Sequence, residues 1–368
     1  METSIQSKKR LVYILHELEI GGVELALISA LETLHQHFDL KVICLGTINT
    51  SLIEHLDEEV KSRLIAIPFS MFKWRKVQKI VHAELNAFAP DFLISSLWKA
   101  HAMAYGFIKK REKTSQECKY FPFFHSAQWA HFLDRWASLK ALKYANRVLV
   151  DSEAVQQFIK RFTTQEIKTI SFLTVTTKTF DNQPDYPENQ SFKAIFLGRL
   201  AAIKNLPLAL QVIHDLREKG IDISFSIYGP GENFWRETLY KEVKLLGLEE
   251  VVFYKGIINP LNRMDVFQEY HFYLQTSDVE GMAMSVTEAM MSGLVPLVTP
   301  VGEIKNYVVD GVSGVLINKN HLADSIEQIK NVALQQSVWE EFQKNAVKTF
   351  EDQIAYKESL LQELKSNG

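Results

Sequence analysis

The chain has 368 residues, of which 46% are hydrophobic and 23% charged, a composition typical of folded globular proteins. At roughly 150 residues per domain, this length predicts two domains. The formal net charge of -3 and the pI near 6.4 argue against a general nucleic-acid binder, because binding to the phosphate backbone needs a strongly basic surface.

The two cysteines and the N-terminal residues indicate the cellular compartment. Cys44 and Cys118 lack the paired spacing of a disulfide framework or a zinc site, and so favour a reducing environment. The opening METSIQSKKR leads into the apolar run 11–15, which is too short for a signal peptide. No segment reaches 18 uninterrupted apolar residues. We expect a cytoplasmic protein, with peripheral contact to the inner face of a membrane as the one membrane role left open.

Short apolar runs alternate with longer amphipathic stretches along both halves of the chain. Continuous apolar strands separated by helices are typical of parallel sheets covered on both faces. The pattern therefore predicts an α/β protein with two doubly wound domains. The expected strands are residues 11–15, 40–45, 92–96, 148–150, 194–197, 223–227, 251–254, 272–274 and 295–298.

The pattern lapses once, in the polar segment TVTTKTFDNQPDYPENQ with its two prolines. We place an interdomain linker there, at residues 176–192. This gives an N-terminal domain at 1–175 and a C-terminal domain at 193–345. The charged, amphipathic segment 346–368 is expected to be a helix that either caps the second domain or crosses back to the first.

The segment SDVEGMAMSVTEAMMSGLVPLVTP, residues 277–300, is the most informative. A helix should begin near Met284 and stop before Gly293, which puts Glu280 ahead of its N-terminus and Glu288 about one turn inside. Free N–H groups at that end, with Gly281 beside them, suit an anion such as a diphosphate. A carboxylate beside such a site suits hydroxyl donors instead.

Two other interpretations apply to these glutamates. They could be the acid and base of a glycosidase, but a helical rise of about 1.5 Å per residue separates them by roughly 12 Å, whereas hydrolases need about 5 to 9.5 Å. They could also be glutamates that stabilise a helix start through its dipole.

The spacing of Glu280 and Glu288 within EGMAMSVTEAMMSGLVPLVT resembles the signature of the large retaining glycosyltransferase family that includes sucrose and trehalose-phosphate synthases, usually called family four. The resemblance implies a GT-B fold, in which two Rossmann-like domains face each other across a cleft. It further implies that Glu288 holds the ribose and Glu280 the donor sugar hydroxyls, with Gly281, Met284 and Ser285 lining the donor site.

Upstream, FLGRLAAIKN at residues 196–205 is similar to the family segment whose cations grip the donor diphosphate, here Arg199 and Lys204. A departing nucleotide diphosphate gains negative charge, which two cations and a helix N-terminus can stabilise without a metal. Read alone, the two side chains are ordinary surface residues.

Three glycine segments resemble other parts of the family. ISFSIYGPGE and VVFYKGII imply donor contacts around Gly229 and, near the base, around Gly256 and Ile257. The opening segment LVYILHELEIGGVELALISAL implies that Gly21 and Gly22 bring the backbone close to phosphate or acceptor. Each segment alone could be a tight turn. None is the Gly-x-Gly-x-x-Gly fingerprint of a dehydrogenase.

The run YFPFFHSAQW places His125 after an apolar strand, where the family often has a histidine that contacts the donor sugar. A lone histidine beside aromatic residues is otherwise a core residue. In ANRVLVDSEAV, Ser152 is expected to be a helix cap. Residues 170–180, ISFLTVTTKTF, depart from the family pattern near the interdomain hinge.

The segment MFKWRKVQKIVHAELNAF, residues 71–88, puts apolar residues at helical spacing and concentrates cations in its first half. Such a helix could rest on anionic lipid. The alternative is a helix packed on the core with a solvated outer face.

The resemblance implies a retaining hexosyltransferase that uses a nucleotide diphosphate sugar as co-substrate, with UDP expected first and GDP next, and the basic diphosphate grip makes a metal unnecessary. The acceptor would be a glycan or lipid-linked molecule, and no other cofactor is expected. Two alternatives stay open, namely a non-catalytic nucleotide-sugar-binding subunit and a nucleotide-sugar epimerase on a similar fold.

Overall fold

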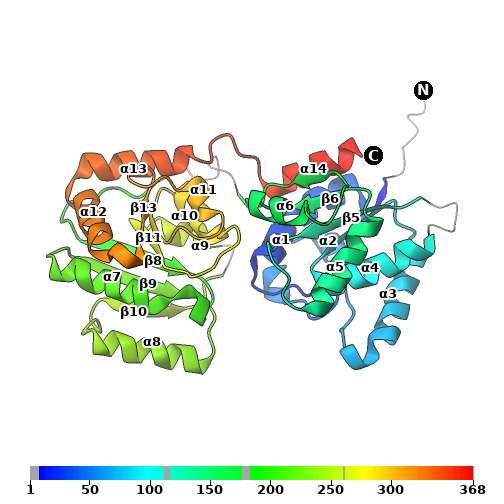
Figure 1. Cartoon of the computed structure of the whole chain (residues 1–368), viewed down its shortest axis with the longest axis horizontal. Coiled ribbons are helices and arrows are strands. Elements are labelled where there is room, and N and C mark those ends of the chain that lie inside the picture. The colour runs from blue at the N-terminus through cyan, green and yellow to red at the C-terminus, as the bar shows by residue number, and fades with distance from the viewer. Residues whose placement is uncertain (1–7, 112–116, 176–182, 260–261, 368) are drawn as a thin grey trace. The chain divides into compact units, whose positions relative to one another are not determined.

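The computed structural model describes residues 8–111, 117–175, 183–259 and 262–367 (Figure 1). It divides the chain into two compact units, Met1–Thr174 with Ile354–Gly368 and Val175–Gln353. Each unit is built on its own parallel sheet.

The first unit contains a seven-stranded sheet in the order β3-β2-β1-β4-β5-β6-β7. Every neighbouring pair is parallel, and β1 lies between β2 and β4, with Leu11 opposite both Leu40 and Phe92. The strands are β1 (Arg10–Leu15), β2 (Asp39–Cys44), β3 (Leu64–Ala66), β4 (Phe92–Ser96), β5 (Lys119–Phe124), β6 (Val148–Val150) and β7 (Ile167–Thr169).

The helices of the first unit connect these strands, and one comes from the end of the chain. They are α1 (Gly22–His37), α2 (Glu58–Lys61), α3 (Trp74–Phe88), α4 (Trp98–Arg111), α5 (Phe132–Tyr144), α6 (Glu153–Ile159) and α14 (Tyr356–Ser366), with the 3-10 turns η1 (Thr50–Leu52) and η2 (Met71–Lys73). Helix α14 packs against α1. Ser152 caps α6, as expected, because its side chain accepts from the Val155 N–H.

The second unit contains a six-stranded parallel sheet in the order β10-β9-β8-β11-β12-β13. Its strands are β8 (Phe192–Leu197), β9 (Ile223–Tyr228), β10 (Val252–Gly256), β11 (Phe272–Gln275), β12 (Val295–Val298) and β13 (Val315–Leu316). Its helices are α7 (Leu206–Glu218), α8 (Asn233–Leu245), α9 (Arg263–Phe267), α10 (Met284–Met291), α11 (Ile304–Tyr307), α12 (Leu322–Leu334) and α13 (Gln336–Lys348), with η4 (Ala202–Lys204) and η5 (Lys319–His321).

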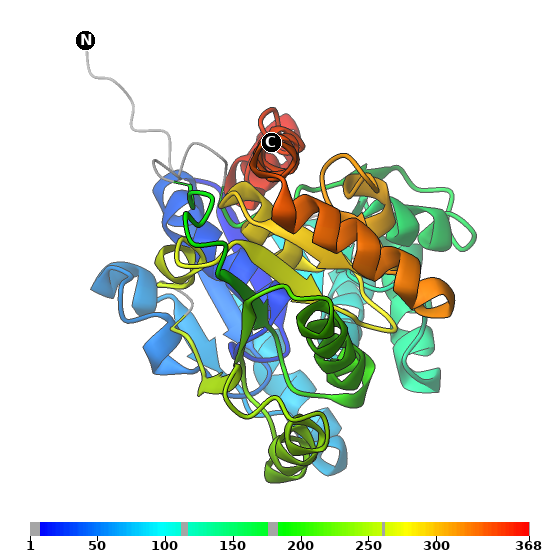
Figure 2. The same ribbon diagram turned by 90° about the vertical axis from the view of Figure 1, so that its left-hand side faces the viewer.

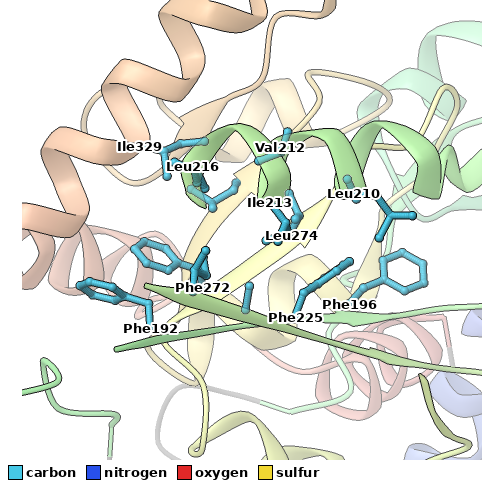
Figure 3. Close-up of a cluster of buried hydrophobic side chains, with 14 of the residues drawn as sticks. Phe192, Phe196, Leu210, Val212, Ile213, Leu216, Phe225, Phe272, Leu274 and Ile329 are labelled. Atoms are coloured by element: carbon cyan, nitrogen blue, oxygen red, sulfur yellow. The ribbon is translucent and has the colours of Figure 1, made fainter. Parts of the chain in front are cut away.

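Helices cover the second sheet on both faces. The chain steps from β8 to β9 toward one edge and from β11 to β12 toward the other, so right-handed crossovers put α7 and α10 on opposite faces (Figure 2). Ile213 and Leu216 of α7 pack over Phe225, Phe272 and Leu274 of the strands (Figure 3). All five are fully buried. The strand β12, VPLV, is buried at every position, as expected for a central strand covered on both faces.

In each sheet, successive strands are added first toward one edge and then toward the other. The change occurs between β1 and β4 in the first sheet and between β8 and β11 in the second. In such sheets, ligands bind outside the carboxyl ends of the strands at this switch point. The loops that follow these four strands are therefore where a site is expected in each unit.

The predicted fold class, two doubly wound α/β domains, is confirmed. The short strands β3, β7 and β13 were not expected, since each has two or three residues at or near a sheet edge. One helix was expected over residues 346–368, and this prediction is wrong. Helix α13 ends at Lys348, and a separate helix, α14, begins only at Tyr356. Part of the expected linker, residues 176–182, lies outside the described residues. No described helix has the length and apolar character needed to cross a membrane.

Candidate functional site

Two loops at the switch point of the second sheet are joined by hydrogen bonds. The Thr276 hydroxyl, after β11, donates to the Asn205 carbonyl after β8 at 2.9 Å. The Asp278 N–H donates to the Ile203 carbonyl at 2.9 Å, and the Asn205 side-chain amide donates to Asp278 Oδ1 at 3.1 Å. These bonds hold the two loops in one fixed arrangement.

The structure brings Lys204 and Glu280, 76 residues apart, into an ion pair. Lys204 Nζ lies 2.6 Å from Glu280 Oε1, and the side chains are 20% and 10% exposed. Gln275 donates to the same oxygen from 3.1 Å. Arg199, after β8, is exposed to solvent. An ammonium has three donors, so the pair with Glu280 leaves Lys204 able to bind an anion.

The loop between Glu280 and helix α10 is shaped by close backbone contacts. A Cβ at Gly302, whose φ is +59°, would lie 2.4 Å from the Glu280 carbonyl oxygen, so no larger residue fits there. Ala283 takes a left-handed conformation with φ of +53° at the start of α10, and the Tyr307 hydroxyl donates to the Met282 carbonyl at 3.0 Å. These contacts hold the loop that precedes the first N–H groups of α10 in one conformation.

Glu288, inside α10, forms a buried ion pair with Arg263 at the start of α9. Arg263 Nη2 lies 2.5 Å from Glu288 Oε1, and the side chains are 11% and 2% exposed. A buried carboxylate is tolerated only when it is paired and hydrogen-bonded. The guanidinium therefore holds the Glu288 carboxyl group in one orientation.

Ser285, in the first turn of α10, rests on a buried tyrosine. Its Oγ lies 2.7 Å from the Tyr273 hydroxyl, and that hydroxyl lies 3.0 Å from the Leu197 carbonyl oxygen, which can accept its proton. Burial raises the pKa of Tyr273 above its usual range, so the hydroxyl stays protonated. Tyr273 thus ties the end of β8 to the start of α10, where Met284 and Ser285 lie.

Of the remaining predicted glycines of this unit, Gly229 and Gly256 lie at the ends of β9 and β10, and Gly281 lies after β11. A Cβ at Gly229 would lie only 1.9 Å from the Gly198 carbonyl oxygen, and its N–H donates to the Gly256 carbonyl at 2.7 Å. Gly256 has φ of +80°, and Ile257 beyond it is 58% exposed. Gly281 is open, because a Cβ there would meet nothing within 4 Å.

In the first unit, three neighbouring strands end in a buried polar network. His125 Nδ1 lies 3.0 Å from Asp151 Oδ2, and its Nε2 lies 3.2 Å from Ser96 Oγ. The His125 and Asp151 side chains are only 6% and 7% exposed. Ser96 also bonds the Tyr13 hydroxyl at 2.7 Å, and burial raises the pKa of Tyr13 to about 12.

Gly21 is the N-cap of α1, and Gly22 begins the helix. A Cβ at Gly21 would lie 2.2 Å from Glu24 Oε2, so the space that the glycine leaves is taken by the Glu24 carboxylate. Burial raises the pKa of Glu24, while the nearby His125 lowers it. A ligand at this helix end would therefore meet Glu24.

Sequence patterns missed Gln275, Arg263, Asp151 and Ser96, and also the two tyrosines of these networks, Tyr13 and Tyr273. Three of them end a strand or directly follow one, which is a usable signal in a parallel sheet. Arg263 lies in a polar stretch and carries no such signal. Among the described residues, no group of three or more His, Cys, Asp or Glu side chains could hold a metal ion.

Residues 178–349 match the family model described as Glycosyl transferases group 1, so this part of the chain contains a glycosyltransferase group 1 domain. The match covers the second unit almost completely. It contains Arg199, Lys204, Glu280 and Glu288.

Curated relatives are similar to parts of the chain. The poly(glycerol-phosphate) alpha-glucosyltransferase of Bacillus subtilis is 28% identical over 165 residues, which are 44% of this chain and 24% of the relative. The GtfA subunit of a UDP-N-acetylglucosamine--peptide N-acetylglucosaminyltransferase from Streptococcus pneumoniae is 24% identical over 55% of this chain and 40% of the relative. These alignments span less than half the length of either relative.

A third relative aligns over most of both chains. The GDP-mannose:cellobiosyl-diphosphopolyprenol alpha-mannosyltransferase of Komagataeibacter xylinus is 22% identical over 85% of this chain and 81% of its own.

Solved structures share the fold along nearly the whole chain. Anabaena HepE in complex with UDP has a TM-score of 0.76 at 16% identity, over 97% of this chain and 100% of its own. Sucrose-phosphate synthase from Thermosynechococcus elongatus has a TM-score of 0.75 at 13% identity, over 98% of both chains. With two Rossmann-like units, the fold is GT-B.

Proposed function

We propose that the chain is a retaining glycosyltransferase that moves a sugar from a nucleotide diphosphate sugar to a glycan or lipid-linked acceptor in surface polysaccharide or glycoconjugate synthesis. The observation that carries the proposal is the Lys204–Glu280 pair at the switch point of the second sheet, in which Lys204 comes from the loop that also contains the exposed Arg199. The ion pair thus places a cation that can bind the diphosphate in direct contact with a carboxylate that can bind sugar hydroxyls.

Each group has a chemical part in this proposal. Arg199, Lys204 and the first N–H groups of α10 stabilise the charge that builds on the departing diphosphate, which makes a metal unnecessary. Glu280 accepts hydrogen bonds from the donor sugar, and Glu288 accepts them from the ribose. Gly256 and Ile257 lie beside the base, and His125 contacts the sugar ring.

The names of the relatives support the donor and acceptor classes. HepE was solved with UDP-glucose, and the Komagataeibacter xylinus relative is named for GDP-mannose and a diphosphopolyprenol acceptor. We therefore propose UDP as the first nucleotide to test and GDP as the second. Two of these relatives are named alpha-transferases, and retention at an α-linked donor gives an α-linked product. We assign the reaction to the cytoplasm, in agreement with the two free cysteines.

The proposal is tested by calorimetric titration with UDP, GDP, ADP and dTDP. We expect one nucleotide to bind, and Arg199→Ala and Glu288→Gln each to weaken it by about 1.5 to 3 kcal/mol, the usual range for a hydrogen bond to a charged group. Arg236→Ala, at a half-buried position on α8, is the matched control. If none of the four nucleotides binds, the proposal is wrong.

A non-catalytic nucleotide-sugar-binding subunit is the second candidate, because the segment ISFLTVTTKTF, residues 170–180, departs from the family pattern. It would bind the same nucleotide with the same sensitivity to Arg199→Ala. The two candidates differ in turnover, since an active transferase also slowly hydrolyses its donor in the absence of acceptor. Release of free sugar that Glu280→Gln abolishes would exclude the non-catalytic candidate.

A further inference from the structure

Large apolar side chains of the first unit are exposed at the starts of two helices. Phe72, in η2 just before α3, is fully exposed, and its neighbour Met71 is 50% exposed. Phe132, the first residue of α5, is 78% exposed. Exposed phenylalanines are costly in water, so two of them in one region are informative.

A cluster of rings places these helix starts next to each other. The Trp74 and Trp98 rings are stacked with centroids 6.4 Å apart, and the Trp98 ring lies 5.0 Å from His131, the residue before Phe132. Phe69 packs edge-on against both tryptophans. Met71, Phe72 and Phe132 therefore flank one rigid base, and we call these three residues the apolar rim.

The apolar stripe of helix α3 is not part of this surface. Val77, Val81 and Leu85 are buried in the core of the first unit. The helix is thus held by the protein, and only its first turn and its outer face are available. This agrees with the core-packed alternative for the stripe and places the exposed apolar residues at the helix start instead.

The two helices that begin at the apolar rim, α3 and α5, contain an excess of positive charge. No acidic residue occurs between 71 and 83, and the one in α5, Asp134, already accepts from the Ala130 N–H and the Ser138 hydroxyl. Within the described residues, none of these cations forms a salt bridge. They are all exposed: Lys73, Arg75, Lys76, Lys79, Arg135 and Lys140. Six cations in one region are a marked excess in a chain whose net charge is -3.

We propose that the apolar rim and these six cations dock the first unit on an anionic membrane surface. Phenylalanine and methionine side chains enter the boundary between headgroups and acyl chains, while lysine and arginine bind lipid phosphates. A protein partner is less favoured, because its interface would need many matching carboxylates around a small apolar centre. The inference uses only residues outside the donor site and does not rest on the proposed function.

Co-sedimentation of the full chain with vesicles tests the docking. Vesicles of equal parts phosphatidylglycerol and phosphatidylcholine should bind the protein, and pure phosphatidylcholine should not. Phe72→Asp and Phe132→Asp should each lower the partition coefficient about tenfold, because a charge cannot enter the acyl boundary. Phe234→Asp is the matched control, since Phe234 is 63% exposed at the start of α8 in the other unit.

Several results would overturn the proposal. Absence of binding to the anionic vesicles would do so, as would equal loss in Phe234→Asp. Binding that salt abolishes but Phe72→Asp leaves unchanged would mean adsorption through another surface. If the protein without vesicles forms a dimer that Phe72→Asp dissociates, the rim is an interface between copies of this chain. Unchanged thermal unfolding of each variant shows that it folds.

Discussion

At the scale of single residues, Arg263 and Glu288 link the stability of the second unit to its candidate site. Both side chains are almost fully buried and lie 2.5 Å apart, and removing one partner of such a pair costs about 3 to 5 kcal/mol. We expect Arg263→Met to lower the unfolding free energy by that amount in urea titrations. Adding Glu288→Gln should restore part of it, because a neutral amide is cheaper to bury than a carboxylate.

The double variant separates two explanations of the loss. If the guanidinium acts through charge, Arg263→Met with Glu288→Gln will be more stable than Arg263→Met alone. Equal stability of the two would mean that Arg263 contributes packing only. In the single variant, nucleotide affinity should also fall, since Glu288 loses the group that orients it.

Residue patterns predicted some partners and missed others for physical reasons. Glu280 and Lys204 were predicted one by one, but their ion pair bridges loops after two different strands, and only the folded sheet brings these loops together. His125 was predicted, whereas Asp151 was not, because a carboxylate after a short strand is also typical of an ordinary helix start. Partners that meet only through sheet topology cannot be derived from spacing.

At the scale of elements, helix α14 stabilises the first unit although it is the last element of the chain. Leu360 and Leu364 are fully buried, and Arg147 Nη1 lies 2.6 Å from Glu363 Oε1. Leu360→Ala should lower the unfolding free energy of the first unit by about 2 to 5 kcal/mol. The transition of the second unit should not move, and Gln362→Ala, at an exposed position, is the matched control.

The two transitions can be followed by limited proteolysis during urea unfolding. Equal destabilisation of both units by Leu360→Ala would contradict the assignment of α14 to the first unit. Periodicity predicted a helix here but not its destination, because an amphipathic pattern shows that a face is buried without showing against what. The central strands were predicted well for the converse reason, since their continuous apolar runs fit few other places.

At the scale of the whole molecule, each unit contains a half-buried neutral histidine beside a strand end, which makes both units sensitive to acid. Burial, helped by Lys99, lowers the pKa of His16 to about 3, and burial, helped by Lys193, lowers that of His271 to about 4. His16 Nε2 accepts a hydrogen bond from the backbone N–H of Lys99, and His271 Nδ1 accepts one from the backbone N–H of Lys193, both at 2.9 Å. A protonated ring could not accept.

The direction of the pH effect follows from these pKa values. In the unfolded chain both histidines bind protons below about pH 6.5, while the folded rings stay neutral until pH 3 to 4. The stability they contribute is therefore complete above pH 6.5 and is lost as the pH falls toward 4. Between pH 6.5 and pH 5, each histidine should lower the free energy of unfolding by about 1 to 2 kcal/mol, since one pH unit corresponds to 1.36 kcal/mol for each proton bound.

Urea unfolding at pH 7.5 and pH 5.0 measures this loss, and variants assign it. His271→Gln should remove the histidine-linked acid sensitivity of the second unit. His16→Gln should remove only part of that of the first unit, because burial also lowers the pKa values of His82 and His101 there. His321→Gln, at an exposed position, should leave both unchanged. If the second unit of His271→Gln still loses as much stability at pH 5.0 as in the unmodified chain, the sensitivity comes from other groups. The acid sensitivity would then come from carboxylates that lose their ion pairs when they are protonated.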